Sequence, residues 1–508
     1  MKKLLVVLLS LGLIVAFGAT ASAADVKFGG SYYLVGVYEN NPLLTPDETA
    51  GYSHYSKAFF YQRFRLQPVL QIAEGLTFTF RLDALEKVWG STNQVGNSVY
   101  AGQSTPDDLT ASRKYNYQAA TTSGGAPFNN ATSNPKIQES LEFERAYVTF
   151  MTGIGQFDVG YQNVDDWGTD FGDYSNSRPK IGFMTKVGPM ILGLAYEKVY
   201  ENMGTTQILT SPVTVYPQEN AVDADKDSYA VYGIYKDKGV EAGLLYKYYA
   251  FNSSRPSGIK SAYNLISPYV KATFGPVYVE GEATYWFGKF AGFEDPYVGF
   301  LAGTNDVDLQ AYSAYLKGKI NVGPAYFGAL FSYASGDDLG DKTKAKTALS
   351  GGGPNFAPAL ILMNDGLNTQ TGGCTGCNPG KLISTTGTLG RGGVDQNAVT
   401  SKKYNTVIYN AFAGFNPTPK LNVEAALTYA TVDKKAMSRV FATGVVTEAV
   451  SDKLGTEFDV KATYKIYDNL TYMVGAGYLW TGDYFKGSNA SNKIDNDYIL
   501  LNQLTLSF

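Results

Sequence analysis

Side chains suited to catalysis are scarce in this chain of 508 residues, which holds one His and two Cys. A Ser-His-Asp hydrolase would have to use His54, and the sequence places His54 in the first polar connection rather than on a strand. One histidine also excludes a His-rich metal site. The sequence therefore predicts no enzyme activity, no metal and no cofactor.

The two cysteines form a C-x-x-C motif, Cys374-Thr-Gly-Cys377, in a glycine-rich stretch. Asn378 follows the motif where a haem attachment site requires His, and there is no second pair of cysteines for zinc. A redox role would need a thioredoxin-like βαβ context, which the surrounding sequence lacks. We favour a disulfide between Cys374 and Cys377 that closes a small ring at a loop tip.

The charged residues are more informative, because two groups of opposite sign recur within the first 180 residues. The basic group is Arg63, Arg65, Arg81 and Arg145, and the acidic group is Asp165, Asp166, Asp170 and Asp173. Opposite charges that face each other across water create a transverse field, which orders polar solutes and discriminates between ions. The simpler alternative is a solvated surface on which Arg81 pairs with Asp83. The choice depends on the elements that position these residues.

Those elements are strands, because apolar and polar residues alternate with a period of two. In 76–84 the apolar set is Leu76, Phe78, Phe80, Leu82 and Ala84, whereas Thr77, Thr79, Arg81 and Asp83 take the other face. This pattern predicts about 18 strands, or 16 if a weak pair near 179–200 is wrong. The predicted ranges are 26–39, 58–73, 76–88, 139–152, 156–162, 179–187, 190–200, 228–235, 240–249, 264–274, 277–287, 307–320, 325–335, 403–415, 421–431, 456–466, 470–480 and 497–508.

Short turns and long polar connections alternate between these strands, and this layout is typical of a transmembrane antiparallel β-barrel. The turns include Gly188-Pro189 and Gly275-Pro276. The long connections are near 40–57, 90–138, 163–178, 201–227, 250–263, 288–306, 336–402, 432–455 and 481–495. A β-propeller or a β-solenoid would need similar loops at both ends or a fixed repeat length, which the sequence lacks.

The first 23 residues are predicted to be an export signal. Lys2 and Lys3 precede an apolar core, and Ala21-Ser22-Ala23 fits a cleavage site. We therefore expect residues 24–508 to form the barrel domain. A formal net charge of −4 at pH 7 gives no electrostatic case for binding nucleic acid. Charged residues make up 17% of the chain, against about 25% in an average protein, as a lipid-facing surface would require.

The last strand carries a further signal. One face holds Tyr498, Leu500, Leu504, Leu506 and Phe508, and only Asn502 interrupts it. Here the chain resembles the outer-membrane β-barrel family of Gram-negative bacteria, and the stretches 145–150 and 155–161 resemble porins of metal-reducing bacteria. The resemblance implies that Phe508 is read by the barrel assembly machinery. It also implies contact with outer-membrane lipid and lipopolysaccharide, a homotrimer, and a third loop that folds into the pore and faces basic residues.

The function that the resemblance implies is that of a porin, a water-filled channel for passive diffusion of small hydrophilic solutes and ions across the outer membrane. Two alternatives stay open: a channel specific for an anion or a sugar, and a barrel sheath around an electron-transfer conduit. Tyrosines in the apolar phase are expected to form girdles at the membrane interfaces. The apolar run 357–363 is expected to pack inside the vestibule, against another subunit or protein, or on its own loop.

Overall fold

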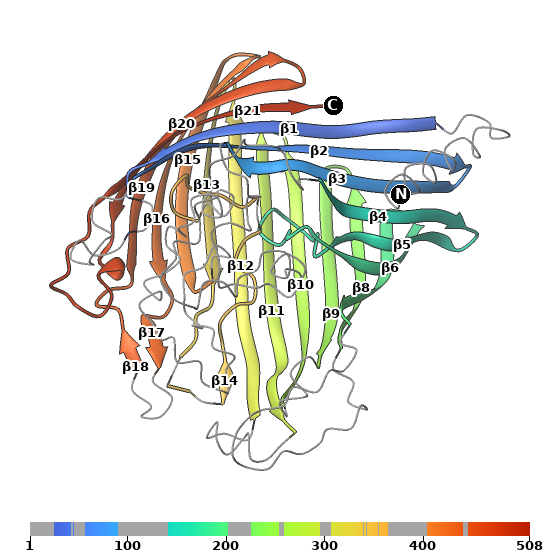
Figure 1. The fold of residues 1–508 in the computed structure, drawn as a ribbon, viewed down its shortest axis with the longest axis horizontal. Helices are drawn as coiled ribbons and strands as arrows, with labels where there is room; N and C mark the ends of the chain where they lie inside the picture. Colours follow the sequence, from blue (N-terminus) through green and yellow to red (C-terminus); the bar gives the residue numbers. More distant parts are fainter. Residues whose placement is uncertain are drawn as a thin grey trace, which may run out of the picture.

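A computed structural model shows one continuous barrel of strands (Figure 1). The export signal predicted at 1–23, His54, Cys374 and Cys377 lie outside the residues that it describes. The described residues are 25–41, 44, 56–89, 141–201, 225–252, 259–294, 306–338, 340–341, 343–353, 355–363, 404–439 and 446–508.

Within this part of the chain, eighteen strands make up the barrel wall. They are β1 (Asp25–Glu39), β2 (Lys57–Ala73), β3 (Leu76–Val88), β4 (Leu141–Thr152), β5 (Gly155–Val164), β6 (Asn176–Val187), β7 (Met190–Tyr200), β8 (Lys226–Asp237), β9 (Val240–Phe251), β10 (Ile259–Phe274), β11 (Val277–Phe293), β12 (Asp306–Val322), β13 (Ala325–Ala334), β15 (Thr406–Thr418), β16 (Leu421–Val432), β19 (Lys453–Tyr467), β20 (Leu470–Thr481) and β21 (Asp497–Ser507).

The barrel is closed. Each of these strands pairs antiparallel with its neighbour in the chain, and β21 pairs with β1 from Ser31↔Ser507 to Glu39↔Ile499. This arrangement confirms the predicted antiparallel barrel and its 18 strands, so the 16-strand alternative is wrong. The predicted strand ends differ most at β10 and β11. β10 begins at Ile259 rather than 264, and β11 continues to Phe293 rather than 287.

The alternation in the sequence separates an outer apolar face from an inner polar face. On β7, Leu192 and Leu194 are 44% and 55% exposed on the outside, whereas Glu197 is buried on the inside. The tight turns use glycines that adopt the left-handed backbone region, for example Gly188 with φ 58° and Gly275 with φ 58°. Side chains with a Cβ are disfavoured in this region, so glycine suits such turns.

Two long connections contain short strands that the sequence did not predict. β14 (Lys344–Ala345) pairs parallel with the start of β12, and β17 (Ala436–Arg439) forms a small hairpin with β18 (Val446–Glu448). The connection before β21 contains a short 3-10 helix, η5 (Asp483–Lys486). No helix among the described residues is long and apolar enough to cross a membrane.

Candidate functional site

The four arginines predicted for the site lie on three adjacent strands, β2, β3 and β4. Arg65 donates two hydrogen bonds to Asp83, with Nε–Oδ1 and Nη2–Oδ2 distances of 2.7 and 2.6 Å. Arg63 lies 3.6 Å from the Glu86 carboxylate. The guanidinium of Arg63 also lies 4.9 Å from the centre of the Tyr33 ring. Tyr33 packs with Tyr61 against side chains inside the barrel, so this row belongs to the inner wall.

Arg81 and Arg145 continue the row. Arg81 Nη2 lies 3.4 Å from Glu144 Oε2, and Arg81 Nε lies 3.6 Å from Asp83 Oδ1. Arg145 Nη2 donates to Asn163 Oδ1 at 2.9 Å, and Asn163 Nδ2 donates to Asp166 Oδ2 at 2.8 Å. This arginine row (Arg63, Arg65, Arg81 and Arg145) therefore alternates guanidinium groups with carboxylates. The ion pair between Arg81 and Asp83 is the one expected by the simpler alternative, a solvated surface.

The acidic loop, 165–175, turns into the barrel from β5 and β6. Asp165 accepts hydrogen bonds from Arg178 at 3.1 Å and from Lys247 on β9 at 2.8 Å. Burial alone would raise the pKa of the Asp165 carboxyl, but the Lys247 ammonium and the Arg178 guanidinium hold it well below its usual value. Asp165 thus stays charged and fixes the loop to β6 and β9.

Further along the loop, two contacts reach β10 and β11. Trp167 Nε1 donates to the Ser267 carbonyl oxygen at 3.0 Å. The backbone N–H and the hydroxyl of Thr169 both donate to Glu282 Oε2 at 2.8 Å. A Cβ at Gly172 would lie 1.8 Å from Glu282 Oε1, so the close approach of loop and wall requires glycine there.

The other three aspartates of the loop differ in surroundings. Asp166 and Asp170 are exposed, whereas Asp173 is half-buried and accepts a hydrogen bond from Ser175 at 2.6 Å. Burial, together with the nearby charges of Asp166 and Asp170, raises the pKa of the Asp173 carboxyl. The structure thus brings Asp166 toward Arg145 and takes Asp165 away from the arginine row.

A second segment, the described residues of 347–363, follows β13 in the chain and meets the acidic loop inside the barrel. Gly353 N donates to the Phe171 carbonyl oxygen at 3.1 Å, and the Tyr174 hydroxyl donates to the Gly352 carbonyl oxygen at 2.8 Å. The Phe171 ring stacks on Tyr315 of β12 at 5.3 Å and packs edge-on against Phe356 at 5.2 Å. The two inward segments therefore form one continuous layer.

The far end of this layer rests on β15, β16 and β19. The Pro358 carbonyl oxygen accepts from Asn410 at 3.0 Å and from Thr428 at 3.3 Å. Glu457 accepts the backbone N–H of Ile361 at 2.6 Å and of Leu362 at 2.7 Å.

Asp459 adds a further hydrogen bond to this segment by accepting the N–H of Leu360 at 3.3 Å. A Cβ at Gly477 on β20 would lie 2.4 Å from Asp459 Oδ1 and 3.3 Å from Glu457 Oε1. The absence of a side chain at Gly477 thus leaves room for both carboxyl groups.

Apolar contacts also hold the segment 347–363 against the inner wall. Ile361 and Leu362 have no exposed surface, and they belong to a cluster with residues of the inner wall: Val35 and Val37 of β1, Ile408 of β15, Leu479 of β20, and Ile499 and Leu501 of β21. Of the alternatives for the apolar run 357–363, packing inside the barrel is therefore the one observed. The sequence alone could not identify the inner-wall residues against which this run packs.

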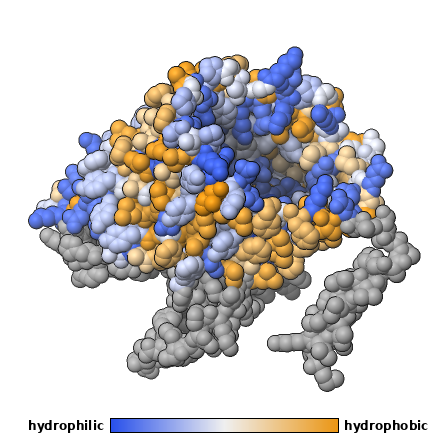
Figure 2. Space-filling view, turned by 90° about the horizontal axis from the view of Figure 1, so that it is seen from above, coloured by the Kyte–Doolittle hydropathy of each residue, from blue (hydrophilic) through white to orange (hydrophobic). Residues whose placement is uncertain are grey.

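Among the described residues, the inward layer contacts some strands of the inner wall and not others. Its hydrogen bonds and ring contacts fall on β6, on β9 to β12 and on β15, β16 and β19. Its apolar cluster extends to β20, β21, β1 and β2. The arginine row lies on β2 to β4, and Tyr33 and Tyr61, which pack beside Arg63, connect it to this layer. Figure 2 shows the molecule hollowed near its centre, with hydrophilic residues around the hollow.

Aromatic side chains that point toward the barrel interior do not form an exposed row along it. Trp286 and Tyr269 are 3% and 6% exposed, and the Tyr269 hydroxyl donates to Glu241 at 3.0 Å. Tyr249 stacks on Tyr263 at 4.8 Å. Outside the barrel, exposed tyrosines lie in the apolar phase as expected: Tyr235, Tyr246, Tyr464, Tyr472 and Tyr478.

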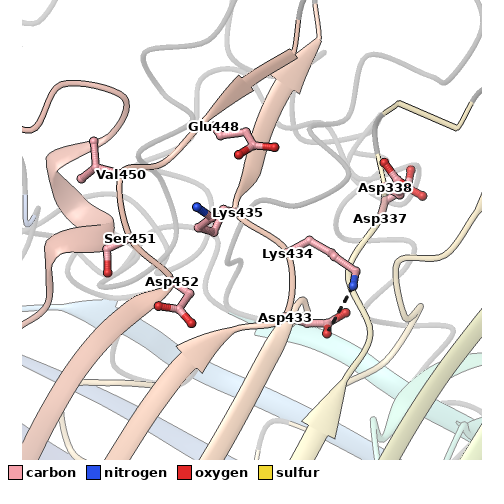
Figure 3. Close-up of a pocket in the computed structure, with 9 residues that line it drawn as sticks. All are labelled: Asp337, Asp338, Asp433, Lys434, Lys435, Glu448, Val450, Ser451 and Asp452. Atoms are coloured by element: carbon pink, nitrogen blue, oxygen red, sulfur yellow. Dashed lines mark ion pairs between the residues drawn. The ribbon is translucent and has the colours of Figure 1, made fainter.

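A pocket of about 520 Å³ lies among the connections that follow β13 and β16 and precede β19 (Figure 3). It is lined by Asp337, Asp338, Asp433, Lys434, Lys435, Glu448, Val450, Ser451 and Asp452. Asp433 is tied to its surroundings, because it accepts the N–H of Gly336 at 2.9 Å and the Tyr333 hydroxyl at 3.3 Å. Among the residues described, no group of His, Cys, Asp and Glu could hold a metal ion.

Phe508, which the sequence analysis proposed as an assembly signal, lies where the first and last barrel strands, β1 and β21, meet. Its backbone exchanges hydrogen bonds with Gly30 of 2.8 and 3.1 Å, and its ring stacks on Phe64 at 6.4 Å. The ring is 49% exposed on the outer face. A role for Phe508 in assembly stays a prediction.

No family model and no curated protein matches the chain. Among solved structures it is similar to an anion-selective porin from Comamonas acidovorans, with 11% identity over 96% of this chain and 100% of that one and a TM-score of 0.40. It is also similar to OccAB4 of Acinetobacter baumannii (12% identity, 96% and 100% coverage, TM-score 0.44). A third likeness is the outer membrane protein opdK of Pseudomonas aeruginosa (9% identity, 95% and 99% coverage, TM-score 0.45). The barrel assignment rests on the strand pairing itself.

Proposed function

We propose that this chain is an outer-membrane porin through which small hydrophilic solutes and ions diffuse passively. The observation that carries the proposal is a closed barrel of 18 strands with an apolar outer face and a charged inner wall. A barrel of this size is too wide for its own wall side chains to fill, so it leaves an aqueous interior. The inward layer then narrows that interior, and none of its described residues bonds to the four arginines.

The solute path in this proposal runs between the inward layer and the inner faces of β2 to β4. Arg63, Arg65, Arg81 and Arg145 line one side. Asp166 and Asp170, which are exposed on the acidic loop, line the other side. Opposed charges across a narrow aqueous path act on passing ions through a transverse field. These six residues are thus the proposed constriction, and Asp165 and Asp173 position the loop that carries two of them.

A channel specific for small anions is the second candidate, and it is supported by the row of arginines. Guanidinium groups donate charge-assisted hydrogen bonds to carboxylate and phosphate oxygens. The side chains of Arg63 and Arg65 are each 24% exposed, so a passing anion could reach them. Saturable block of conductance by one anion, at concentrations where others have no effect, distinguishes this candidate from a general porin. A sheath around an electron carrier is disfavoured, since 347–363 occupies part of the interior.

The remaining parts of the proposal follow from placement in the outer membrane. Residues 1–23 would direct export, Phe508 would be read by the barrel assembly machinery, and the outer face would contact lipid and lipopolysaccharide. A homotrimer belongs to the same proposal.

Single-channel recording of the purified protein in planar bilayers, across KCl gradients, tests the function. We expect discrete open levels with a conductance that rises with salt. A protein that forms no pores and migrates identically in gels before and after boiling would refute the proposal.

A further inference from the structure

Arg63 is held in the arginine row differently from its neighbour Arg65. Arg65 donates two short hydrogen bonds to Asp83, whereas the Arg63 guanidinium lies 3.9 Å from Asp83 and 3.6 Å from Glu86. Both of these separations exceed hydrogen-bond distance. The Arg63 guanidinium instead lies over the face of the Tyr33 ring, with 4.9 Å between its carbon and the ring centre. An aromatic face attracts a guanidinium at this distance, so the position of the Arg63 head depends on where the Tyr33 ring stands.

The Tyr33 ring is the first of three aromatic rings that contact one another on the inner face of β1 and β2. Three pairs of directly opposed residues follow one another along these strands: Tyr33 and Arg63, Val35 and Tyr61, and Val37 and Phe59. The Tyr33 ring meets the Tyr61 ring edge-on at 6.0 Å, and the Tyr61 ring lies 6.1 Å from the Phe59 ring. Opposed residues of antiparallel strands pack side by side, so this aromatic group (Tyr33, Tyr61 and Phe59) is continuous.

The aromatic group packs against segment 347–363. All three of its members are partly buried and contact the apolar cluster that contains Ile361 and Leu362. Val35 and Val37, which alternate with these rings, are each 5% exposed and belong to the same cluster. Hydrogen bonds to β19 fix this part of the segment. A continuous series of contacts therefore joins the inward segment to the arginine row.

We propose that Tyr33 is a positioning residue for Arg63, and that segment 347–363 fixes Tyr33 through the aromatic group. The inference rests on the proposed function, in which Arg63 lines the solute path. With the ring in place, the Arg63 head stands away from Asp83 and Glu86, and its positive field extends into the path. Without the ring, the guanidinium closes both gaps and forms charge-assisted hydrogen bonds with the two carboxylates. The ion preference of the channel thus depends on a segment whose described residues make no bond to Arg63.

Tyr33→Leu in the full-length protein tests the positioning, with the reversal potential in a KCl gradient as readout. An exposed cation–π contact changes a population by roughly two- to fivefold, so the fraction of Arg63 held over the ring should fall by about that factor. We expect a shift toward cation preference that is smaller than the shift caused by Arg63→Gln. Tyr33→Phe keeps the ring and should retain the wild-type potential.

Two further variants separate positioning from a general effect on the barrel. Tyr32→Leu is the matched control, because Tyr32 lies on the opposite face of β1 and bonds to Gln62, and it should leave the potential unchanged. In an Arg63→Gln background, Tyr33→Leu should add no further shift. Equal shifts by Tyr33→Leu in both backgrounds, or no shift in either, would overturn the positioning role.

Glu457→Ala tests the link to the segment. It should shift the reversal potential in the same direction as Tyr33→Leu, and it should add nothing in a Tyr33→Leu background. A Glu457→Ala channel with the wild-type potential, or shifts that add, would overturn the link. Pore formation and heat-modifiable migration are measured on the same samples. Failure of this inference in channels that conduct is therefore distinguishable from failure of the porin proposal, in which the wild type forms no pores.

Discussion

Removal of the Glu457 carboxyl should loosen the inward segment 347–363. Glu457 has no exposed surface, and its two oxygens accept the N–H groups of Ile361 and Leu362. In Glu457→Ala both donors stay buried without an acceptor, which costs about 1–3 kcal/mol each, or about 2–6 kcal/mol in total. Since about 1.4 kcal/mol is a factor of ten, the displaced population should rise by roughly 30-fold to 10⁴-fold.

Single-channel recording and limited proteolysis both detect this displacement. We expect Glu457→Ala to show larger or noisier open levels and faster cleavage within 347–363. Glu424→Ala is the control, because Glu424 also lies inside the barrel and pairs with Lys461 at 2.9 Å and with the Tyr326 hydroxyl at 2.8 Å, away from that segment. Equal conductance, noise and cleavage in the wild type and Glu457→Ala would refute the argument that these hydrogen bonds hold the segment.

Three further predictions concern the inward layer and the arginine row. Arg63→Glu combined with Arg65→Glu should shift the reversal potential toward cation preference in a KCl gradient, and an unchanged potential would remove both residues from the path. Phe171→Ala should free the two inward segments from each other at a cost of about 3–5 kcal/mol, measured as faster cleavage within 347–363; cleavage at the wild-type rate would contradict the contact. Burial raises the pKa of Asp173, so its protonated form is favoured in the folded loop, and the carboxyl loses its charge at a higher pH than an ordinary aspartate as pH falls. The loop beside the path then loses one negative charge, so cation preference should decline as pH falls toward that range, while Asp165, whose pKa is lowered, keeps its charge. Asp173→Asn should remove part of the decline, and a pH profile identical to that of the wild type would count against an effect of the Asp173 charge on ion preference.

The strands were predictable because each barrel strand repeats the same two-face pattern. The misjudged ends coincide with bulges, where one extra residue reverses the faces and hides the alternation. The β10–β11 register shifts between Lys260 and Ala262, and the β11–β12 register shifts between Lys289 and Ala291. These shifts account for the missing parts of β10 and β11.

The arginine row was predictable in position but not in pairing. Arg65 and Asp83 face each other only because of the register between β2 and β3, which no local pattern specifies. The hydrogen bonds that hold 347–363 to the wall could not be predicted for the same reason. Its hydrogen bonds join Ile361 and Leu362 to Glu457, some 95 residues further along the chain.

The most direct test of the proposed path is thiol accessibility in the open channel. In a Cys374→Ser, Cys377→Ser background, Glu144→Cys places a thiol beside Arg81 in the arginine row, where the Glu144 side chain is 29% exposed. Ile408→Cys places one beneath segment 347–363, where the residue has no exposed surface. A charged methanethiosulfonate reagent added to an open channel should modify Glu144→Cys rapidly and lower its conductance, and should leave Ile408→Cys unchanged. Equal modification of both positions, or of neither, would contradict a solute path along the arginine row.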